Sequence, residues 1–311
     1  MSETSPRYGR DLHKPMRVAV LFSGGASSGK VMLEDPERGK KYQVVVAGTD
    51  RPKGAREKGV RMFREADVPV IDSLERLGST RTSSRRFFYG PLGRNYTEVD
   101  GTAPSGLRDV VKHPGYWEAW VKALEPYDVD MVALSGLMIL VEEPFLSEYR
   151  HRIANVHPAP LHMLSGPRVD RLDLSGVSLE VAADIVRRNR LKRKYKGEDA
   201  VYDAVVSGEP ETRSTVHFLA DKPKDYDEGV IAVESKPFEI DREWVAKRLG
   251  ERNFGPVRKY ADELQEKMKW EGDGPAFTFL MRELADGALN YHGNSIWHRG
   301  RQLTYEGFQL E

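Results

Sequence analysis

The sequence contains no cysteine among its 311 residues. This absence excludes disulfide-linked scaffolds, thiolate metal sites and cysteine nucleophiles, and it suits a reducing compartment. The sequence also lacks any apolar run longer than a strand, and residues 1–15 are polar, without the apolar segment of a signal peptide. We therefore expect a soluble, cytoplasmic protein that neither crosses nor binds a membrane.

The chain has no surplus of charge of either sign. Lysine and arginine together number 48, as do aspartate and glutamate, so the formal net charge at pH 7 is zero. Such a chain has no overall field to attract nucleic acid or an anionic membrane. We therefore expect small-molecule substrates and no nucleic-acid partner.

Short apolar segments alternate with helical patterns along the chain. Apolar runs at 17–22, 42–48 and 68–72 predict buried strands, and 53–65 carries Val60 and Phe63 on one helical face. This β-α-β rhythm is typical of an α/β fold with a doubly wound, mostly parallel sheet. Further strands are predicted at 130–134, 153–156, 214–219 and 230–234, and helices at 116–124, after Ser178 as N-cap, and near 277–284.

Two stretches interrupt this pattern. Residues 78–112 are rich in Gly, Ser, Thr, Pro and Arg, and residues 163–196 end in a basic run that starts at Arg187. We predict a disordered arm at 1–15 and one domain at 16–311 that carries both stretches as insertions. The domain ends in a small β segment around a turn at 298–301.

The first strand is followed by a turn of small residues with the sequence SGGASSG at 23–29. Small residues let backbone N–H groups approach an anion at the start of a helix, so we expect a phosphate site. The turn nearly matches a P-loop, but Val31 follows Lys30 where that motif needs Ser or Thr. It also nearly matches the loop of ATP pyrophosphatases, with Ser27 in place of the required Asp. An ATP-binding protein of either kind, or a plain strand-to-helix turn, remains an alternative.

Asn155 and His157 lie two residues apart at the end of a predicted strand. Residues at this spacing share a face, and open α/β sheets bind ligands at the carboxyl ends of their strands. An amide can donate to a developing oxyanion, and an imidazole can move a proton near neutral pH. The pair therefore favours acyl transfer to an amine. For this tetrapeptide alone, a turn cap at Asn155 with His157 packed beside Pro158 is an equal alternative.

Several segments, in the same order, resemble the phosphoribosylglycinamide (glycinamide ribonucleotide) formyltransferases, a family of folate-dependent enzymes of purine synthesis. The family's opening strand and SGxGSN loop correspond to 18–28, its AGFMRIL to 135–141, and its NIHPSL to 155–160. Its TVHF recurs unchanged at 215–218, and its closing ADGxL and GxQL correspond to 285–289 and 307–310. The matches span most of the chain and leave the two insertions between them.

The resemblance implies transfer of a formyl group from 10-formyltetrahydrofolate, as co-substrate, to the amine of glycinamide ribonucleotide, without a metal. It makes Asn155 and His157 the catalytic pair, with Asp227 as the third member because it keeps the family's D-x-G spacing; Asp225 is the reserve. Asp227 is expected to orient the imidazole and favour its charged form. His217, within the TVHF strand, is expected to be a satisfied structural histidine.

The resemblance also assigns substrate contacts. The predicted phosphate-binding residues are Gly24, Gly25, Ala26, Ser27 and Ser28, the ribose contact is Asp273, and the folate-binding residues are Leu137, Met138, Ile139, Leu140 and Val141. An apolar stripe such as 137–141 is equally compatible with ordinary core. The basic run of the second insertion has two interpretations, a solvated helix end or a lid or anchor for the acidic tail of a folate.

Other members of the same fold remain alternatives: another folate-dependent formyltransferase or a formyltetrahydrofolate hydrolase shares the Asn–His–Asp site. The acceptor, the pterin carrier and the oligomeric state, monomer or homodimer, stay open.

Overall fold

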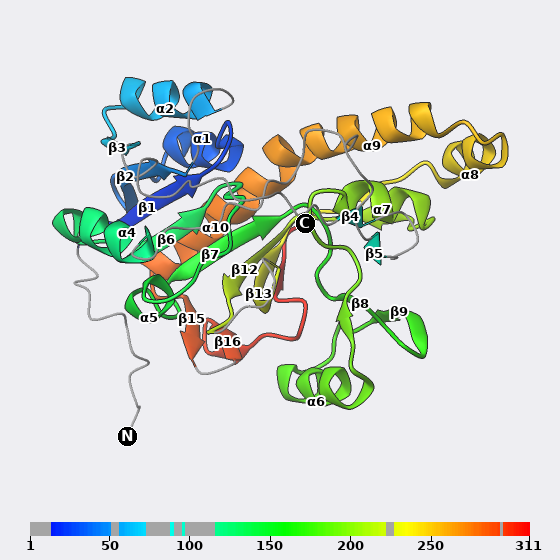
Figure 1. Ribbon diagram of the computed structural model, residues 1–311. Helices are drawn as coiled ribbons and strands as arrows, with labels where there is room; N and C mark the ends of the chain where they lie inside the picture. The colour runs from blue at the N-terminus through cyan, green and yellow to red at the C-terminus, as the bar shows by residue number, and fades with distance from the viewer. Residues whose placement is uncertain are drawn as a thin grey trace.

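The computed structural model describes residues 14–50, 56–72, 88–89, 95–96, 116–221, 227–292 and 295–311. Its largest sheet has eight strands in the order β18-β13-β12-β7-β6-β1-β2-β3 (Figure 1). In chain order these strands are β1 (Met16–Phe22), β2 (Tyr42–Thr49), β3 (Val70–Ile71), β6 (Met131–Leu134), β7 (Ile153–His157), β12 (Thr215–Leu219), β13 (Gly229–Glu234) and β18 (Phe308–Gln309).

The central sheet is mostly parallel. Strands β3, β2, β1, β6 and β7 run in one direction, and β18 is parallel to β13. Strand β12 is antiparallel to both of its neighbours, β7 and β13. The predicted doubly wound α/β fold is confirmed, with β12 as the point where the strand direction reverses.

The reversal at β12 brings distant residues opposite each other. Asn155 pairs with His217 across the β7–β12 ladder, and His157 pairs with Thr215. Partners directly opposite in an antiparallel ladder project on the same face of the sheet. Side chains from the NVHP and TVHF motifs therefore share one face, although Asn155 and His217 are 62 residues apart in sequence.

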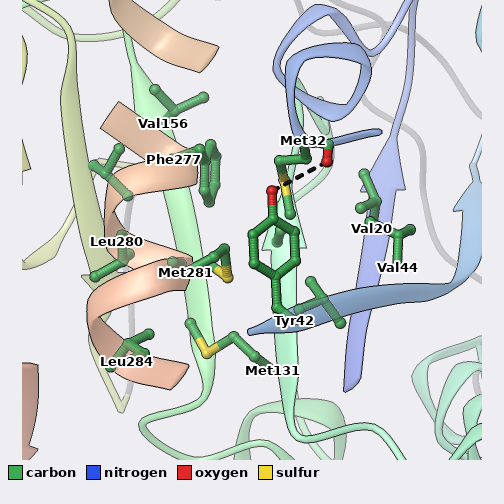
Figure 2. Packing of buried hydrophobic residues seen from close by; sticks show 14 of the residues in the cluster. Val20, Met32, Tyr42, Val44, Met131, Val156, Phe277, Leu280, Met281 and Leu284 are labelled. Atoms are coloured by element: carbon green, nitrogen blue, oxygen red, sulfur yellow. Dashed lines mark hydrogen bonds between the residues drawn. The ribbon is translucent and has the colours of Figure 1, made fainter. Parts of the chain in front are cut away.

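Helices cover both faces of the sheet (Figure 1). On one face lie α1 (Ser27–Glu34), α2 (Arg56–Glu65) and α10 (Gly274–Ala285), and on the other lie α4 (Tyr116–Leu124) and α5 (Phe145–Glu148). Under α10, Phe277 and Leu280 pack into a core that reaches Tyr42, whose hydroxyl donates to the Met32 carbonyl at 3.0 Å (Figure 2). The apolar strand runs of the sequence are thus buried on both sides, as a parallel sheet requires.

The second predicted insertion folds into a small unit of its own. It contains β8 (Met163–Gly166), β9 (Val169–Asp173), α6 (Leu179–Asn189) and β10 (Lys192–Arg193), and the strands form a sheet in the order β10-β8-β9. Ser178 caps α6, as predicted, by accepting a hydrogen bond from Val181 N. Of the first insertion only β4 (Phe88–Tyr89) and β5 (Asn95–Tyr96) are described, and of the predicted arm only residues 14 and 15.

The remaining elements complete the fold around this frame. They are η1 (Glu125–Tyr127), α7 (Ala200–Val206), β11 (Glu211–Thr212), β14 (Phe238–Glu239), α8 (Arg242–Gly250), α9 (Phe254–Met268), η2 (Lys269–Asp273), β15 (Leu289–His292), β16 (Ser295–His298) and β17 (Arg301–Gln302). Strands β15, β16 and β17 form the predicted C-terminal β segment. Helices α8 and α9 were not predicted. Across the described ranges, no helix combines the length and the apolar character needed to span a membrane.

Candidate active site

The carboxyl ends of β1, β6 and β7 meet at one edge of the sheet, and hydrogen bonds join the loops that follow β1 and β6. Met138 N donates to Ser23 Oγ at 2.7 Å, and the hydroxyls of Ser28 and Ser135 are 2.6 Å apart. Because His157 ends β7 in the same direction, the SGGASSG turn, the 135–141 segment and the NVHP motif gather at this edge. Ligands of open α/β sheets bind at such an edge.

His157 is buried and both of its ring nitrogens have an acceptor. Nδ1 lies 3.0 Å from Asp227 Oδ1, and Nε2 lies 3.1 Å from the carbonyl oxygen of Tyr195. Since neither acceptor can donate, this arrangement suits an imidazolium that carries both protons. Burial alone would lower the pKa of His157, but the charge and hydrogen bond of Asp227 outweigh it and raise the pKa above its usual value.

Asp227 is the matching half of this pair. Only 3% of the residue is exposed, and Oδ2 accepts a hydrogen bond from Gly197 N at 3.0 Å. Burial alone would raise the pKa of Asp227, but the positive charge of His157 holds it well below the usual range of a carboxyl. The structure thus brings Asp227 to His157, as predicted; the reserve residue, Asp225, lies outside the described residues.

Asn155 stands beside a second buried histidine. Its Nδ2 lies 3.3 Å from Nε2 of His217. Burial lowers the pKa of His217 to about 4, so the ring is neutral near pH 7 and Nε2 accepts from the amide. Within the described part of the chain, Nδ1 of His217 has no hydrogen-bond partner. His217 is therefore buried, as expected, but it is not fully satisfied and it orients Asn155. That contact was not predicted.

Asp273 lies at the junction of η2 and α10, 7% exposed. Burial raises the pKa of Asp273 to about 6, against the lowering effect of Ser214 and of the charge on His157. Among the described residues its Oδ1 has no hydrogen-bond partner. The start of α10 packs tightly on α1, since a Cβ at Gly274 would lie 2.4 Å from the side chain of Val31. The predicted ribose contact is therefore a buried carboxyl that carries an unused acceptor and senses His157.

The predicted phosphate loop leaves open space in front of its glycines. Among the described residues, a Cβ added at Gly24 or Gly25 would meet no heavy atom within 4 Å. Helix α1 starts at Ser27, after Ala26 in a left-handed conformation, so its first N–H groups have no partner within the helix. The hydroxyl of Ser28 is turned inward to Ser135, which leaves only the peptide N–H of Ser28 for an anion.

Lys30 follows this loop but does not face it as a P-loop lysine would. Its Nζ pairs with Glu34 on the same helix at 2.6 Å and lies over the ring of Trp270. The missing Ser or Thr at position 31 and this outward lysine both count against a P-loop.

The five residues predicted to bind folate alternate between two environments. Leu137, Ile139 and Val141 are at most 7% exposed and belong to the core beneath α4 and α5. Met138 and Leu140 are half-buried. The segment therefore serves both as core and as a border of the site, and only its alternate side chains can reach a ligand.

Comparisons with known proteins bear on the fold that holds this site. No family model matches the chain. It is 24% identical over 222 residues, 71% of its length, to the human trifunctional purine biosynthetic protein adenosine-3, and 22% identical over 193 residues, 61% of its length, to phosphoribosylglycinamide formyltransferase from Escherichia coli. The solved structure of phosphoribosylglycinamide formyltransferase from Coxiella burnetii superposes with a TM-score of 0.58 at 16% identity, covering 96% of this chain and 100% of that one.

The chain has the fold of the phosphoribosylglycinamide formyltransferases. The resemblance first seen in the motifs is confirmed, in sequence by curated relatives of low identity and in architecture by solved structures. The chain spans 15% of the length of the human relative and 66% of that of the Escherichia coli protein. The same architecture also occurs in a formyltetrahydrofolate deformylase from Pseudomonas syringae, with a TM-score of 0.54 at 12% identity over 93% of this chain and 67% of that one.

Proposed function

We propose that this protein is an enzyme that transfers the formyl group of 10-formyltetrahydrofolate to the amine of glycinamide ribonucleotide by direct attack. One observation carries the proposal: the imidazole of His157, held by the buried carboxylate of Asp227, lies on the same face and strand as the Asn155 amide. Acyl transfer to an amine creates negative charge on an oxygen and requires a proton to move. An amide donor beside a buried cation meets both needs.

Each residue of the site has a role in this reaction. As the amine attacks the formyl carbon, the amide of Asn155 donates to the oxygen that becomes negative, and the cation of His157 stabilises the same charge. The attacking amine must lose one proton and the leaving folate nitrogen must gain one. The His157–Asp227 pair provides an acid and a base within hydrogen-bonding distance for this exchange.

His217 supports the amide in this proposal. Because its neutral ring accepts one N–H of Asn155, the second N–H of that amide is left to face the substrate. The same contact fixes the orientation of the amide, so that nitrogen and oxygen do not exchange places.

The substrate contacts follow from the surroundings of the pair. The open turn at 24–27 and the first N–H groups of α1 suit the phosphate of a ribonucleotide. The family motif assigns the ribose contact to Asp273, whose Oδ1 is buried and has no partner among the described residues. Met138 and Leu140, half-buried beside the turn, suit the apolar surface of a pterin. Within the described ranges, no group of three or more His, Asp or Glu side chains is placed to hold a metal ion.

Hydrolysis of formyltetrahydrofolate is the second candidate, because a solved deformylase has the same architecture. The two reactions use the same carrier and differ in the nucleophile, an amine in one and water in the other. An open phosphate loop favours the transfer, since water needs no phosphate site.

The deciding experiment follows folate absorbance with 10-formyltetrahydrofolate, with and without glycinamide ribonucleotide, for the wild type and for Asn155→Ala. We expect turnover only when the ribonucleotide is present, and a rate about 10²–10³-fold lower in the variant because one oxyanion donor is lost. Turnover without the ribonucleotide would establish hydrolysis instead. Wild-type rates in Asn155→Ala would remove that residue from the site.

A further inference from the structure

The second insertion ends directly against the His157–Asp227 pair. The carbonyl of Tyr195 accepts from His157 Nε2 at 3.1 Å, and the N–H of Gly197 donates to Asp227 Oδ2 at 3.0 Å. Both members of the pair are therefore held by backbone groups of one short stretch of chain, at 195–197. In this arrangement the insertion forms part of the wall of the site.

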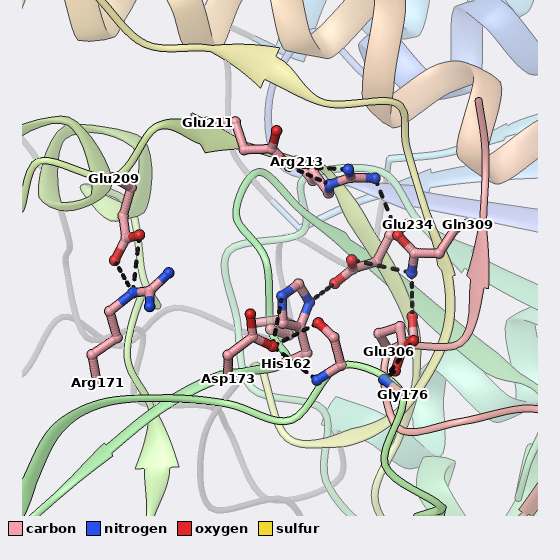
Figure 3. Close-up of polar contacts among 12 residues, drawn as sticks. His162, Arg171, Asp173, Gly176, Glu209, Glu211, Arg213, Glu234, Glu306 and Gln309 are labelled. Carbon is pink, nitrogen blue, oxygen red and sulfur yellow. Dashed lines mark hydrogen bonds and ion pairs between the residues drawn. The ribbon is translucent and has the colours of Figure 1, made fainter. Parts of the chain in front are cut away.

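The side chain of Tyr195 is fixed by a buried carboxylate. Tyr195 is 1% exposed, and its hydroxyl donates to Oε1 of Glu209, which is 6% exposed. Both oxygens of Glu209 also accept from Arg171 Nε, at 3.0 and 3.1 Å (Figure 3). Lys194 Nζ lies 3.4 Å from Oε1 of Glu209. Burial alone would raise the pKa of Glu209, but the bonds from Tyr195 and Arg171 lower it, so the carboxylate stays charged.

The same stretch is tied to the central sheet. The guanidinium of Arg193 donates to the carbonyl of Leu161, which follows β7, and to the carbonyl of Gly229 at 2.9 Å, where β13 begins. Arg193 thus joins the last strand of the insertion to both chain segments that deliver His157 and Asp227. Two contacts therefore fix the carbonyl of Tyr195. The hydroxyl of Tyr195 binds Glu209, and Arg193, two residues earlier in the chain, binds the central sheet.

We propose that Tyr195 and Glu209 are positioning residues, which hold the imidazole of His157 through the main-chain carbonyl of Tyr195. The carbonyl gives Nε2 an acceptor, as Asp227 does for Nδ1, so both protons stay on the ring in the resting enzyme. Glu209 acts only through the hydroxyl of Tyr195. The kinetic part of this proposal rests on the proposed function, whereas the protonation of His157 does not.

The sign of the expected pH effect follows from the charges around His157. It faces the carboxylates of Asp227 and Asp273, the neutral ring of His217 and the Tyr195 carbonyl, with the cation of Arg193 on the same stretch. The carbonyl favours the charged ring. If the Tyr195 carbonyl is held less firmly, the pKa of His157 should therefore fall, and the alkaline limb of the rate profile should move to lower pH.

The fold provides a matched control for this test. Tyr42 is fully buried, and its hydroxyl bonds to Oδ2 of Asp35, which Arg282 Nε also contacts at 2.9 Å. Tyr42→Phe and Tyr195→Phe both remove a bond from a buried tyrosine hydroxyl to a carboxylate held by arginine; Tyr42→Phe also removes the contact with the Met32 carbonyl. Only Tyr195 lies against the catalytic pair.

The experiment measures the NMR titration of His157 in ¹⁵N-histidine-labelled protein, with the signal identified by its absence in His157→Gln, and the pH profile of kcat/KM for formyl transfer. For Tyr195→Phe we expect both midpoints to fall by about half a pH unit, a fraction of one hydrogen bond. For Tyr42→Phe both midpoints should stay at the wild-type value.

The two readouts separate the two proposals. An NMR midpoint in Tyr195→Phe equal to that in Tyr42→Phe would overturn the positioning role, whether or not transfer occurs. A shifted NMR midpoint in a protein that transfers no formyl group would support the positioning role and refute the proposed function.

Discussion

Two regions of the candidate site are built in opposite ways. Around His157 the functional groups are side chains, at most 8% exposed, and each is fixed by a neighbour. At the turn between β1 and α1 the functional groups are backbone N–H donors, and Gly24 and Gly25 face open space. The difference follows from the work each region is proposed to do. Polarising a reacting bond needs a dry, fixed environment, whereas holding a phosphate needs only exposed donors.

The enclosed region itself contains a contrast between two histidines. His157 and His217 are both buried, yet the pKa of His157 is raised and that of His217 is lowered to about 4. Burial acts in the same direction on both rings. The difference comes from the charges around them: Asp227 hydrogen-bonds to His157 and favours its charged form, whereas the charges of Arg193 and His157 act against a charge on His217. The neighbouring charges therefore decide in which ring the charged form is favoured.

The largest effect should come from removing the carboxylate partner in Asp227→Asn. Without Asp227 the buried imidazole of His157 loses its counter-charge and its pKa falls, so we expect the rate of formyl transfer to drop about 10²–10⁴-fold. Steady-state kinetics would measure the loss. Asp221→Asn is the control, because Asp221, like Asp227, lies between β12 and β13 but pairs with Arg150 at the surface. Equal rates in the two variants would show that the enclosed carboxylate has no part in the reaction.

A smaller effect, on stability, should separate the two histidines. In the unfolded chain His217 takes up a proton below a pH of about 6.5, but in the native protein it stays neutral to about pH 4. Native stability should therefore fall as the pH decreases between these values, by up to about 3 kcal/mol. His217→Gln should lack this loss, as measured by urea unfolding at several pH values.

The pH dependence of stability should have the opposite sign for the ring of His157. Because the pKa of His157 is raised in the native protein, its contribution to stability is complete below pH 6.5 and is lost as the pH rises through the folded-state pKa. If His217→Gln unfolds with the acid-side slope of the wild type, then His217 does not remain neutral in the native protein.

The smallest effect is expected in the open region, from Gly25→Ala. The added methyl meets no atom of the described residues within 4 Å, so stability should stay within about 0.5 kcal/mol of the wild type. A phosphate bound at the turn would meet that methyl. We expect the KM for the ribonucleotide to rise about 5–10-fold with little change in kcat, a cost near 1 kcal/mol. Gly250→Ala is the control, since its added methyl also meets nothing and lies at the end of α8. Identical KM values would place the phosphate elsewhere.

The enclosed region was only partly predictable from sequence. The shared face of Asn155 and His157 follows from the two-residue period of a strand, and Asp227 followed from the spacing of the family motif. The separation of Leu137, Ile139 and Val141 from Met138 and Leu140 did not follow from that period, because this segment lies after β6 and is not a strand. The contact of His217 with Asn155 depends on the register between β7 and β12, which a strand pattern alone does not fix.

Other features had either a weak signal or none. Helix α9 buries Val257, Ala261, Leu264 and Met268, which recur at helical spacing, so its pattern was present in the sequence but was not used. The contact from Tyr195 leaves no trace in the sequence, because it is made by a main-chain carbonyl that every residue possesses. The pairing of Tyr195 with Glu209 arises only when the insertion folds back onto the sheet.

The pairing of His157 with Thr215 also bears on how such a protein can change in length. The chain leaves the central sheet after His157 and returns to it at Thr215. Residues 158–214 therefore form one long connection whose two ends lie opposite each other in the β7–β12 ladder. Lengthening such a connection costs little free energy, because doubling the length of a flexible loop costs only about 0.6 kcal/mol. New segments can therefore be inserted between β7 and β12 without changing the register of these strands. A segment inserted there lies next to the reacting groups.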